Sequence, residues 1–176
     1  SRSNRIENFL KDFYLKNIKI LDVGSGLGIF PYEMKKRGFK IYALDPDRKM
    51  SNFIKNKLNI FCYKSDFINF KKNIKFNLIT FNKVLEHVEK PIQFLKQARK
   101  YLKKKDDVIY VEVPDTNSAK IISKNREEFF IEHINCFSEK SLILLLQKCG
   151  FEIQEFKKIK ESSGKFTMYA FAKLKL

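Results

Sequence analysis

The sequence predicts an α/β fold: a doubly wound, mostly parallel seven-stranded sheet with an antiparallel C-terminal hairpin. Three observations predict it. Short apolar runs alternate with helical patterns, a glycine-rich turn directly follows the first apolar run, and a turn sequence divides two long C-terminal strands. Strands separated by helical segments imply right-handed crossovers, which place successive strands parallel to one another.

The elements follow in chain order. Apolar residues at helical spacing in 4–16 predict an amphipathic helix on the sheet edge, within an N-terminal segment 1–17. The alternation then predicts strands at 18–23, 39–44, 59–62, 76–81 and 107–113 and helices at 30–37, 48–57 and 92–103. We expect one domain over residues 1–176, because no Pro/Gly-rich linker divides the chain.

The C-terminal third has a different pattern. After Pro114, a polar and aromatic segment, 114–138, leads to a Leu-rich helix at 141–149 that Gly150 closes. Two last strands, 151–160 and 165–174, are separated by Glu-Ser-Ser-Gly, which is typical of a hairpin turn.

The net charge of +16 raises nucleic acid, an anionic membrane surface or an acidic substrate as partners. The lysines are scattered along a chain that is also rich in Ile, Asn and Phe. A general compositional bias is therefore the favoured interpretation, and the basic charge alone identifies no partner.

Cysteine and histidine usage limits the covalent and metal chemistry. The chain has three cysteines, none of them in a C-x-x-C pair, and two histidines. Their spacing fits neither a disulfide framework nor a structural zinc site, so we predict no metal. A reducing cytoplasm fits best. No apolar run approaches the ~20 residues that span a bilayer, and no signal-peptide pattern opens the chain. Since residue 1 is Ser, we expect a preceding segment to have been removed.

The turn after the first strand predicts a nucleotide pocket. In ILDVGSGLGIF, residues 20–30, the strand ends in Asp22, and three glycines follow, at 24, 26 and 28. Glycine permits positive φ and lets bare backbone approach a ligand. The second strand ends in Asp45, where a carboxylate can accept both hydroxyls of an adenosyl ribose. Asp66 follows the third strand, within reach of an adenine amino group.

These features resemble the class I S-adenosylmethionine-dependent methyltransferases, over nearly the whole chain from about Ile18 to Leu174. FNLITFNKVLEHVEKP, residues 76–91, is similar to that family's fourth-strand motif. S-adenosylmethionine carries a sulfonium and an amino acid instead of a pyrophosphate, so a pocket rimmed by carboxylates suits it better than it suits NAD.

The resemblance implies the cofactor contacts. Gly24 and Gly26 approach the methionine end, Asp45 binds the ribose, and Asp66 lies near adenine. The predicted cofactor-binding residues are Asp22, Gly24, Ser25, Gly26, Gly28, Asp45, Pro46, Asp66, Phe67 and Asn82. Two structural roles stay open as well: Asp45 precedes Pro46 and could cap a helix, and Asp66 could merely end a turn.

Two Glu-His pairs are the candidates for catalysis. Glu86 and His87 follow the fourth strand, where a histidine could act as general base or bridge a loop and a helix. Glu132 and His133 lie in an E-H-x-x-x-F-S stretch that resembles acceptor-side segments of small-molecule and sugar methyltransferases. In that interpretation, the cleft has apolar walls made by Phe129, Phe130 and Phe137. In the alternative, these aromatic residues belong to the core and Ser138 caps the next helix.

The predicted function is therefore methyl transfer from S-adenosylmethionine to a small-molecule acceptor, with a sugar, nucleotide-sugar or other phosphorylated, anionic metabolite as the suggested class. RNA methylation stays open but is disfavoured, because no N/D-P-P-Y/F run follows the fourth strand. The sequence is also compatible with a non-catalytic cofactor-binding protein and with a dehydrogenase. The methylated atom and the oligomeric state are not predicted.

Overall fold

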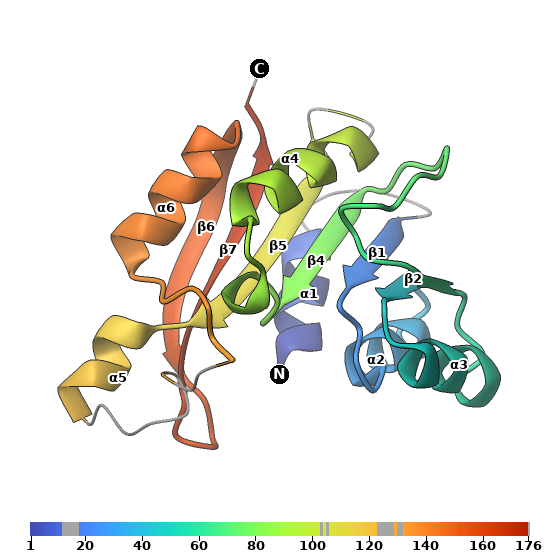
Figure 1. Ribbon diagram of the computed structural model, residues 1–176, viewed down its shortest axis with the longest axis horizontal. Helices are drawn as coiled ribbons and strands as arrows, with labels where there is room; N and C mark the ends of the chain where they lie inside the picture. The colour runs from blue at the N-terminus through green and yellow to red at the C-terminus, as the bar shows by residue number, and fades with distance from the viewer. Residues whose placement is uncertain (12–17, 103, 105, 123–128, 130–131, 176) are drawn as a thin grey trace.

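The computed structural model has one seven-stranded sheet in the order β3-β2-β1-β4-β5-β7-β6 (Figure 1). It describes residues 1–11, 18–102, 104, 106–122, 129 and 132–175. Strand β1 pairs in parallel with both β2 and β4, so the strand order reverses beside it. In open α/β sheets, ligands bind at the carboxyl ends of the strands at this reversal, which is where the glycine turn lies.

The parallel strands are β1 (Lys19–Val23), β2 (Lys40–Asp45), β3 (Cys62–Lys64), β4 (Leu78–Asn82) and β5 (Val108–Pro114), and the antiparallel strands are β6 (Phe151–Lys160) and β7 (Phe166–Leu174). The helices are α1 (Arg2–Lys11), α2 (Ile29–Lys36), α3 (Arg48–Lys57), α4 (Pro91–Tyr101), α5 (Thr116–Ile122) and α6 (Glu139–Lys148), with a 3₁₀ turn η1 at Leu85–His87.

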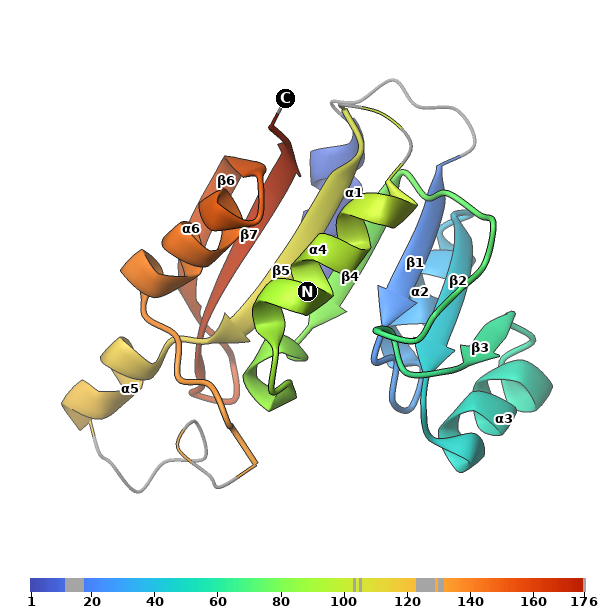
Figure 2. The same cartoon turned by 45° about the horizontal axis from the view of Figure 1, so that its top comes forward.

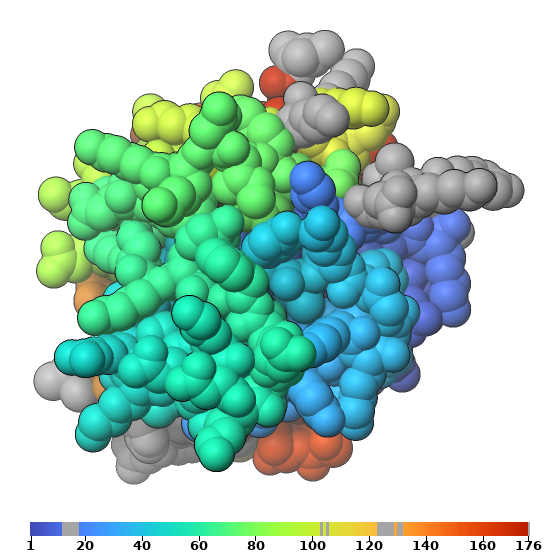
Figure 3. All heavy atoms as spheres, turned by 90° about the vertical axis from the view of Figure 1, so that its right-hand side faces the viewer, coloured from blue at the N-terminus to red at the C-terminus, as the bar shows by residue number. Residues whose placement is uncertain are grey.

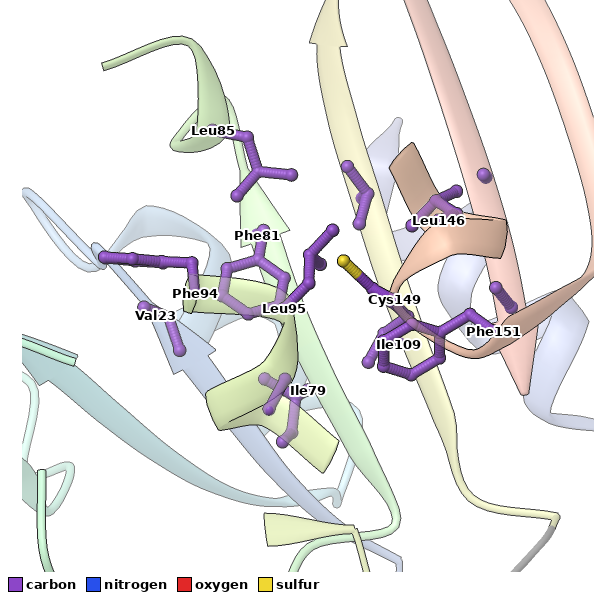
Figure 4. Packing of buried hydrophobic residues seen from close by; sticks show 14 of the residues in the cluster. Val23, Ile79, Phe81, Leu85, Phe94, Leu95, Ile109, Leu146, Cys149 and Phe151 are labelled. Carbon is purple, nitrogen blue, oxygen red and sulfur yellow. The ribbon is translucent and has the colours of Figure 1, made fainter. Parts of the chain in front are cut away.

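The sheet is covered on both faces. Successive residues of a strand point to opposite faces, and Ile20 and Leu21 of β1 accordingly belong to two separate buried clusters. One cluster lies under α1, α2 and α3, and the other lies under α4 and α6, which stand in front of the sheet in Figure 1. In the second cluster, Phe81 packs near Leu95, and Leu146 packs near Phe151 (Figure 4).

The predicted fold class is confirmed, including the antiparallel hairpin. Strand β7 pairs antiparallel with β5 and β6, and Gly164 adopts φ 85° in the turn that joins β6 to β7. Ser138 caps α6, because its hydroxyl accepts the backbone N–H of Ser141 at 3.1 Å. The interpretation of Ser138 as a cap is thus confirmed, and Phe137 is buried in the core.

Three element predictions need correction. The strand expected at 59–62 begins only at Cys62, because Asn59 adopts a left-handed φ of 52° that no regular strand allows. The polar stretch after Pro114 contains α5, where Asp115 accepts the N–H of Ser118 at 3.2 Å as an N-terminal cap does. Helix α1 occupies residues 2–11 and packs on a face of the sheet, where Phe9 stacks on Phe171 of β7, and not on the sheet edge. Positions 12–16 of the predicted helix lie outside the described residues.

The far edge of the sheet, at β3, is flanked by α3 and by the segment that follows β3 (Figures 2 and 3). Phe53 and Phe61 are exposed at this edge, at 42% and 56%. Among the described residues, none of the helices has the length and apolar character that crossing a bilayer requires.

Candidate active site

The glycine turn is held open by backbone geometry that glycine favours. Gly24, Gly26 and Gly28 all have positive φ, at 70°, 51° and 71°. A Cβ on Gly24 would lie 2.8 Å from Cγ2 of Val84, and one on Gly28 would lie 2.7 Å from Cδ1 of Leu58. A side chain at either position would therefore overlap with Val84 or Leu58.

Asp22 fastens this turn to β4. Its Oδ1 accepts the hydroxyl of Thr80 at 2.7 Å and the amide of Asn82 at 2.6 Å, and its backbone carbonyl accepts the hydroxyl of Ser25 at 3.0 Å. Burial raises the pKa of Asp22 to about 6, against the lowering effect of these hydrogen bonds. Asn82 Oδ1 is buried and has no hydrogen-bond partner among the described residues. An acceptor is therefore available beside the glycine turn.

Asp45 connects the turn to the end of β2. One carboxylate oxygen accepts the backbone N–H of Gly26 at 2.8 Å, and the other accepts the N–H of Asp47 at 2.9 Å. The cap of α3 is Asp47, whose Oδ1 accepts from Lys49 and Met50. The interpretation of Asp45 as the cap of this helix is thus wrong. Each Asp45 oxygen keeps a further lone pair for a ligand hydroxyl.

A cavity of about 560 Å³ opens beside the turn, a volume within the range of small-molecule sites. Gly24, Pro46, Asp66 and Phe67 line it on the predicted cofactor side, and His87 lines it on the rim after β4. Asp66 is exposed, and its Oδ1 accepts the N–H of Ile68 at 3.1 Å. This hydrogen bond agrees with the structural role left open for Asp66, in which the residue ends a turn. The other predicted cofactor residues are not among the residues that line this cavity.

The two Glu-His pairs lie together although they are distant in the sequence. Nδ1 of His87 lies 2.9 Å from the carbonyl oxygen of Glu132, and the rings of His87 and His133 meet edge to face with centroids 4.9 Å apart. The Glu132 side chain is exposed, and neither Glu132 nor His133 lines the cavity. Phe129 is half-buried, and the predicted wall residue Phe130 lies outside the described residues.

Asn135 holds this arrangement in place, and the sequence prediction missed it. Its side-chain amide donates to the carbonyls of Leu85 and Val88, at 3.1 and 2.6 Å, and its N–H donates to the carbonyl of Glu86 at 3.0 Å. Residues 132–135 are thereby fixed to η1. An asparagine that donates to loop carbonyls belongs to no periodic pattern, so the sequence carries no signal for this role.

Glu86 is the most unusual group of the site. Its side chain is 1% exposed, and neither carboxylate oxygen has a hydrogen-bond partner among the described residues. Burial raises the pKa of Glu86 to about 7.

A second buried carboxylate, Glu112 on β5, is paired in register with Asn82 at the end of β4. It accepts from Arg2 and Arg5 of α1 and from the hydroxyl of Tyr110. Burial alone would raise the pKa of Glu112, but the two arginines and the Tyr110 hydrogen bond outweigh it, so the pKa lies below its usual value. Helix α1 is therefore tied to the strand ends beside the site.

Comparison with known proteins identifies the family. Residues 2–155 match the family described as methyltransferase domain. The chain belongs to this family. It is a class I, S-adenosylmethionine-dependent methyltransferase domain, and S-adenosylmethionine is its cofactor.

Two curated relatives are similar to the methyltransferase domain, and both are named ubiquinone biosynthesis O-methyltransferase. The protein of Pelagibacter ubique is 34% identical over 110 residues, which are 56% of this chain and 46% of that protein. The protein of Rickettsia bellii is 22% identical over 171 residues, covering 89% of this chain and 71% of that protein. The match thus spans less than half the length of the Pelagibacter protein.

Solved structures share the fold of the methyltransferase domain. An S-adenosylmethionine-dependent methyltransferase from Clostridium acetobutylicum superposes with a TM-score of 0.80 at 16% identity, covering 99% of this chain and 91% of that one. Magnesium protoporphyrin IX methyltransferase from Synechocystis, solved with bound SAH, gives 0.76 at 16% identity, covering 99% and 82%.

The residues present fit the cofactor. The turn offers bare backbone where a Cβ would collide, and Asn82 Oδ1 is a buried acceptor for an ammonium group. Asp45 has spare lone pairs beside the turn. These are the properties that an adenosyl amino acid requires, although the individual contacts remain predictions.

Proposed function

We propose that this domain transfers the methyl group of S-adenosylmethionine to a hydroxyl oxygen of a small aromatic acceptor. The observation that carries the proposal is the shared cavity: predicted cofactor residues such as Gly24 and Phe67 line it together with His87. An acceptor held near His87 would thus lie in the same enclosure as the cofactor. The names of the two relatives support oxygen as the methylated atom.

The cavity lining favours an aromatic acceptor. Val84, Val88 and Phe94 supply apolar surface near His87. In contrast, Lys90 is the only lysine or arginine among the described lining residues, and the acids Asp66 and Glu89 line the same cavity. The suggested phosphorylated sugar would need a more basic lining, and the comparisons offer no support for it. The charge of +16 is the one observation that favours nucleic acid.

In the proposed reaction, the acceptor oxygen attacks the methyl carbon in line with the carbon–sulfur bond. The protein contributes chiefly orientation inside a closed site. Asp22 and Asp45 fix the glycine turn, and Asn135 fixes the rim on which His87 stands. The hydroxyl must lose its proton, and we assign its acceptance to His87, the one histidine among the described lining residues.

The test is a methyl-transfer assay on the purified full chain with methyl-labelled S-adenosylmethionine. Acceptors would be an ortho-dihydroxybenzoate, a simple amine, a nucleotide sugar and a short RNA. We expect the labelled methyl group to be bound to a hydroxyl oxygen of the dihydroxybenzoate, as a methyl ether. Transfer to RNA or to the nucleotide sugar alone would refute the proposed acceptor class.

A further inference from the structure

Three metal-ligating side chains converge at the rim of the cavity. The ligand atoms of Glu86, His87 and His133 all lie within 4.8 Å of one another. Ligands about 2.1 Å from a tetrahedral metal ion are about 3.4 Å apart. The three side chains therefore come close to the spacing that one metal ion requires.

Glu86 has no hydrogen-bonded lysine or arginine among the described residues. A buried carboxylate without hydrogen bonds is unfavourable unless it is protonated or a positive charge compensates it. The two basic groups whose charges act on Glu86 are those of Lys83 and Arg2. Lys83 Nζ binds Glu161 at 2.7 Å, and Arg2 binds Glu112. Both cations therefore already have other partners.

His87 is oriented as a metal ligand would be. The carbonyl of Glu132 can only accept a hydrogen bond, so it places the proton on Nδ1 of His87. The lone pair then lies on Nε2, where it can bind a cation. Such a backbone carbonyl behind the ring is the usual partner of a metal-binding histidine. Asn135 supports the same geometry by fixing η1 to the segment that carries His133.

We propose that Glu86, His87 and His133 bind one divalent transition-metal ion. Two imidazoles and one carboxylate favour Zn²⁺, Mn²⁺ or Fe²⁺ over Ca²⁺ and Mg²⁺, which prefer oxygen ligands. Three protein ligands leave coordination positions open, as in catalytic rather than structural sites. Since His87 also lines the cavity, the ion would face the space beside the cofactor. The sequence predicted no metal because the ligands come from two distant segments.

A catalytic role for the ion rests on the proposed function. A bound cation lowers the pKa of a coordinated hydroxyl. The hydroxyl proton passes to solvent, the oxygen forms the bond to the methyl carbon, and the electrons of the broken carbon–sulfur bond stay on sulfur. The ion would then replace His87 as the means of activating the acceptor.

The test is metal binding to the full chain after chelator treatment, without cofactor or acceptor. Titration with Co²⁺, followed by visible absorption, and with Mn²⁺, followed by electron paramagnetic resonance, should each show one ion per chain. Removing a hydrogen-bond partner of a metal ligand costs about 10- to 100-fold in affinity. Loss of a ligand itself in Glu86→Gln or His133→Gln should weaken binding by at least that much.

Two variants are matched controls. Glu132→Gln changes an exposed acid beside His133 but keeps the carbonyl that holds His87, and Cys136→Ser removes the nearest exposed thiol. Both should bind the ions as the unmodified chain does. If Glu86→Gln does not fold, His133→Gln decides, because it changes a half-buried side chain outside the helices and strands.

Absence of binding to the folded chain would overturn the metal site, as would unchanged affinity in His133→Gln. A cobalt–thiolate band that disappears in Cys136→Ser would overturn it too. None of these outcomes touches the proposed methyl transfer, which is measured separately. Methyl transfer that persists unchanged with chelator would remove only the catalytic role of the ion.

Discussion

The two sides of the cavity are built in different ways. On the predicted cofactor side, the turn after β1 presents backbone, and the carboxylates of Asp45 and Asp22 hold it through hydrogen bonds with Gly26 and Thr80. On the acceptor side, side chains from two distant segments meet, and Asn135 joins them. The first side depends on local chain geometry, whereas the second depends on tertiary packing. Variants should therefore affect cofactor binding and acceptor chemistry separately.

The largest effect should come from Gly24→Ala. The new Cβ would lie 2.8 Å from Val84 at a residue with φ 70°, so the turn must move. We expect S-adenosylhomocysteine affinity to fall by more than about tenfold, which corresponds to about 1.4 kcal/mol. Calorimetric titration measures it.

Gly38→Ala, in the turn after α2, is the matched control for this substitution. It has a similar positive φ, but its Cβ would meet nothing within 4 Å. Its thermal stability should fall through backbone strain alone. Equal losses of affinity in the two variants would show that the contact with Val84 is irrelevant.

Asp45→Asn should rank second. The amide keeps one acceptor and loses the other, so one of the hydrogen bonds to Gly26 and Asp47 fails. Hydrogen bonds to charged groups contribute about 1.5–3 kcal/mol, and cofactor affinity should drop accordingly. Asp47→Ser keeps a cap on α3 and should retain affinity. Normal affinity in Asp45→Asn would exclude this carboxylate from the site.

Asn135→Ala should separate the two sides. It removes the donors to Leu85 and Val88, so kcat for methyl transfer should fall about tenfold or more while the Kd for S-adenosylhomocysteine stays unchanged. Asn117→Ala, on the exposed face of α5, is the control. A parallel loss of cofactor affinity would mean that the two sides are not independent.

The smallest effect concerns the pH dependence of stability. Burial raises the pKa of Asp22 from 3.8 to about 6, so the folded chain retains this proton where the unfolded chain has lost it. Its contribution to the free energy of unfolding is full below about pH 4 and declines as pH rises through about 6. Asp22→Asn cannot ionise, so its Tm relative to the unmodified chain should rise by a few degrees between pH 4 and 7. A pH-independent difference would contradict the shifted pKa.

The sequence predicted what short-range patterns determine. The glycines at 24, 26 and 28 and the acid at 45 indicated the turn, because positive φ and strand ends leave local marks. The pairing of Asp22 with Thr80 and Asn82 could not be foreseen, since it needs the register of β1 against β4. The meeting of His87 with His133 likewise depends on how residues 132–135 pack against η1.

The central claim is that the glycine turn and the carboxylate behind it bind S-adenosylmethionine. Titration calorimetry of the full chain with S-adenosylhomocysteine tests it most directly, with Gly24→Ala in parallel. We predict one binding site per chain, strongly weakened in the variant. No heat of binding to the folded chain, or equal affinity in the variant, would contradict the claim.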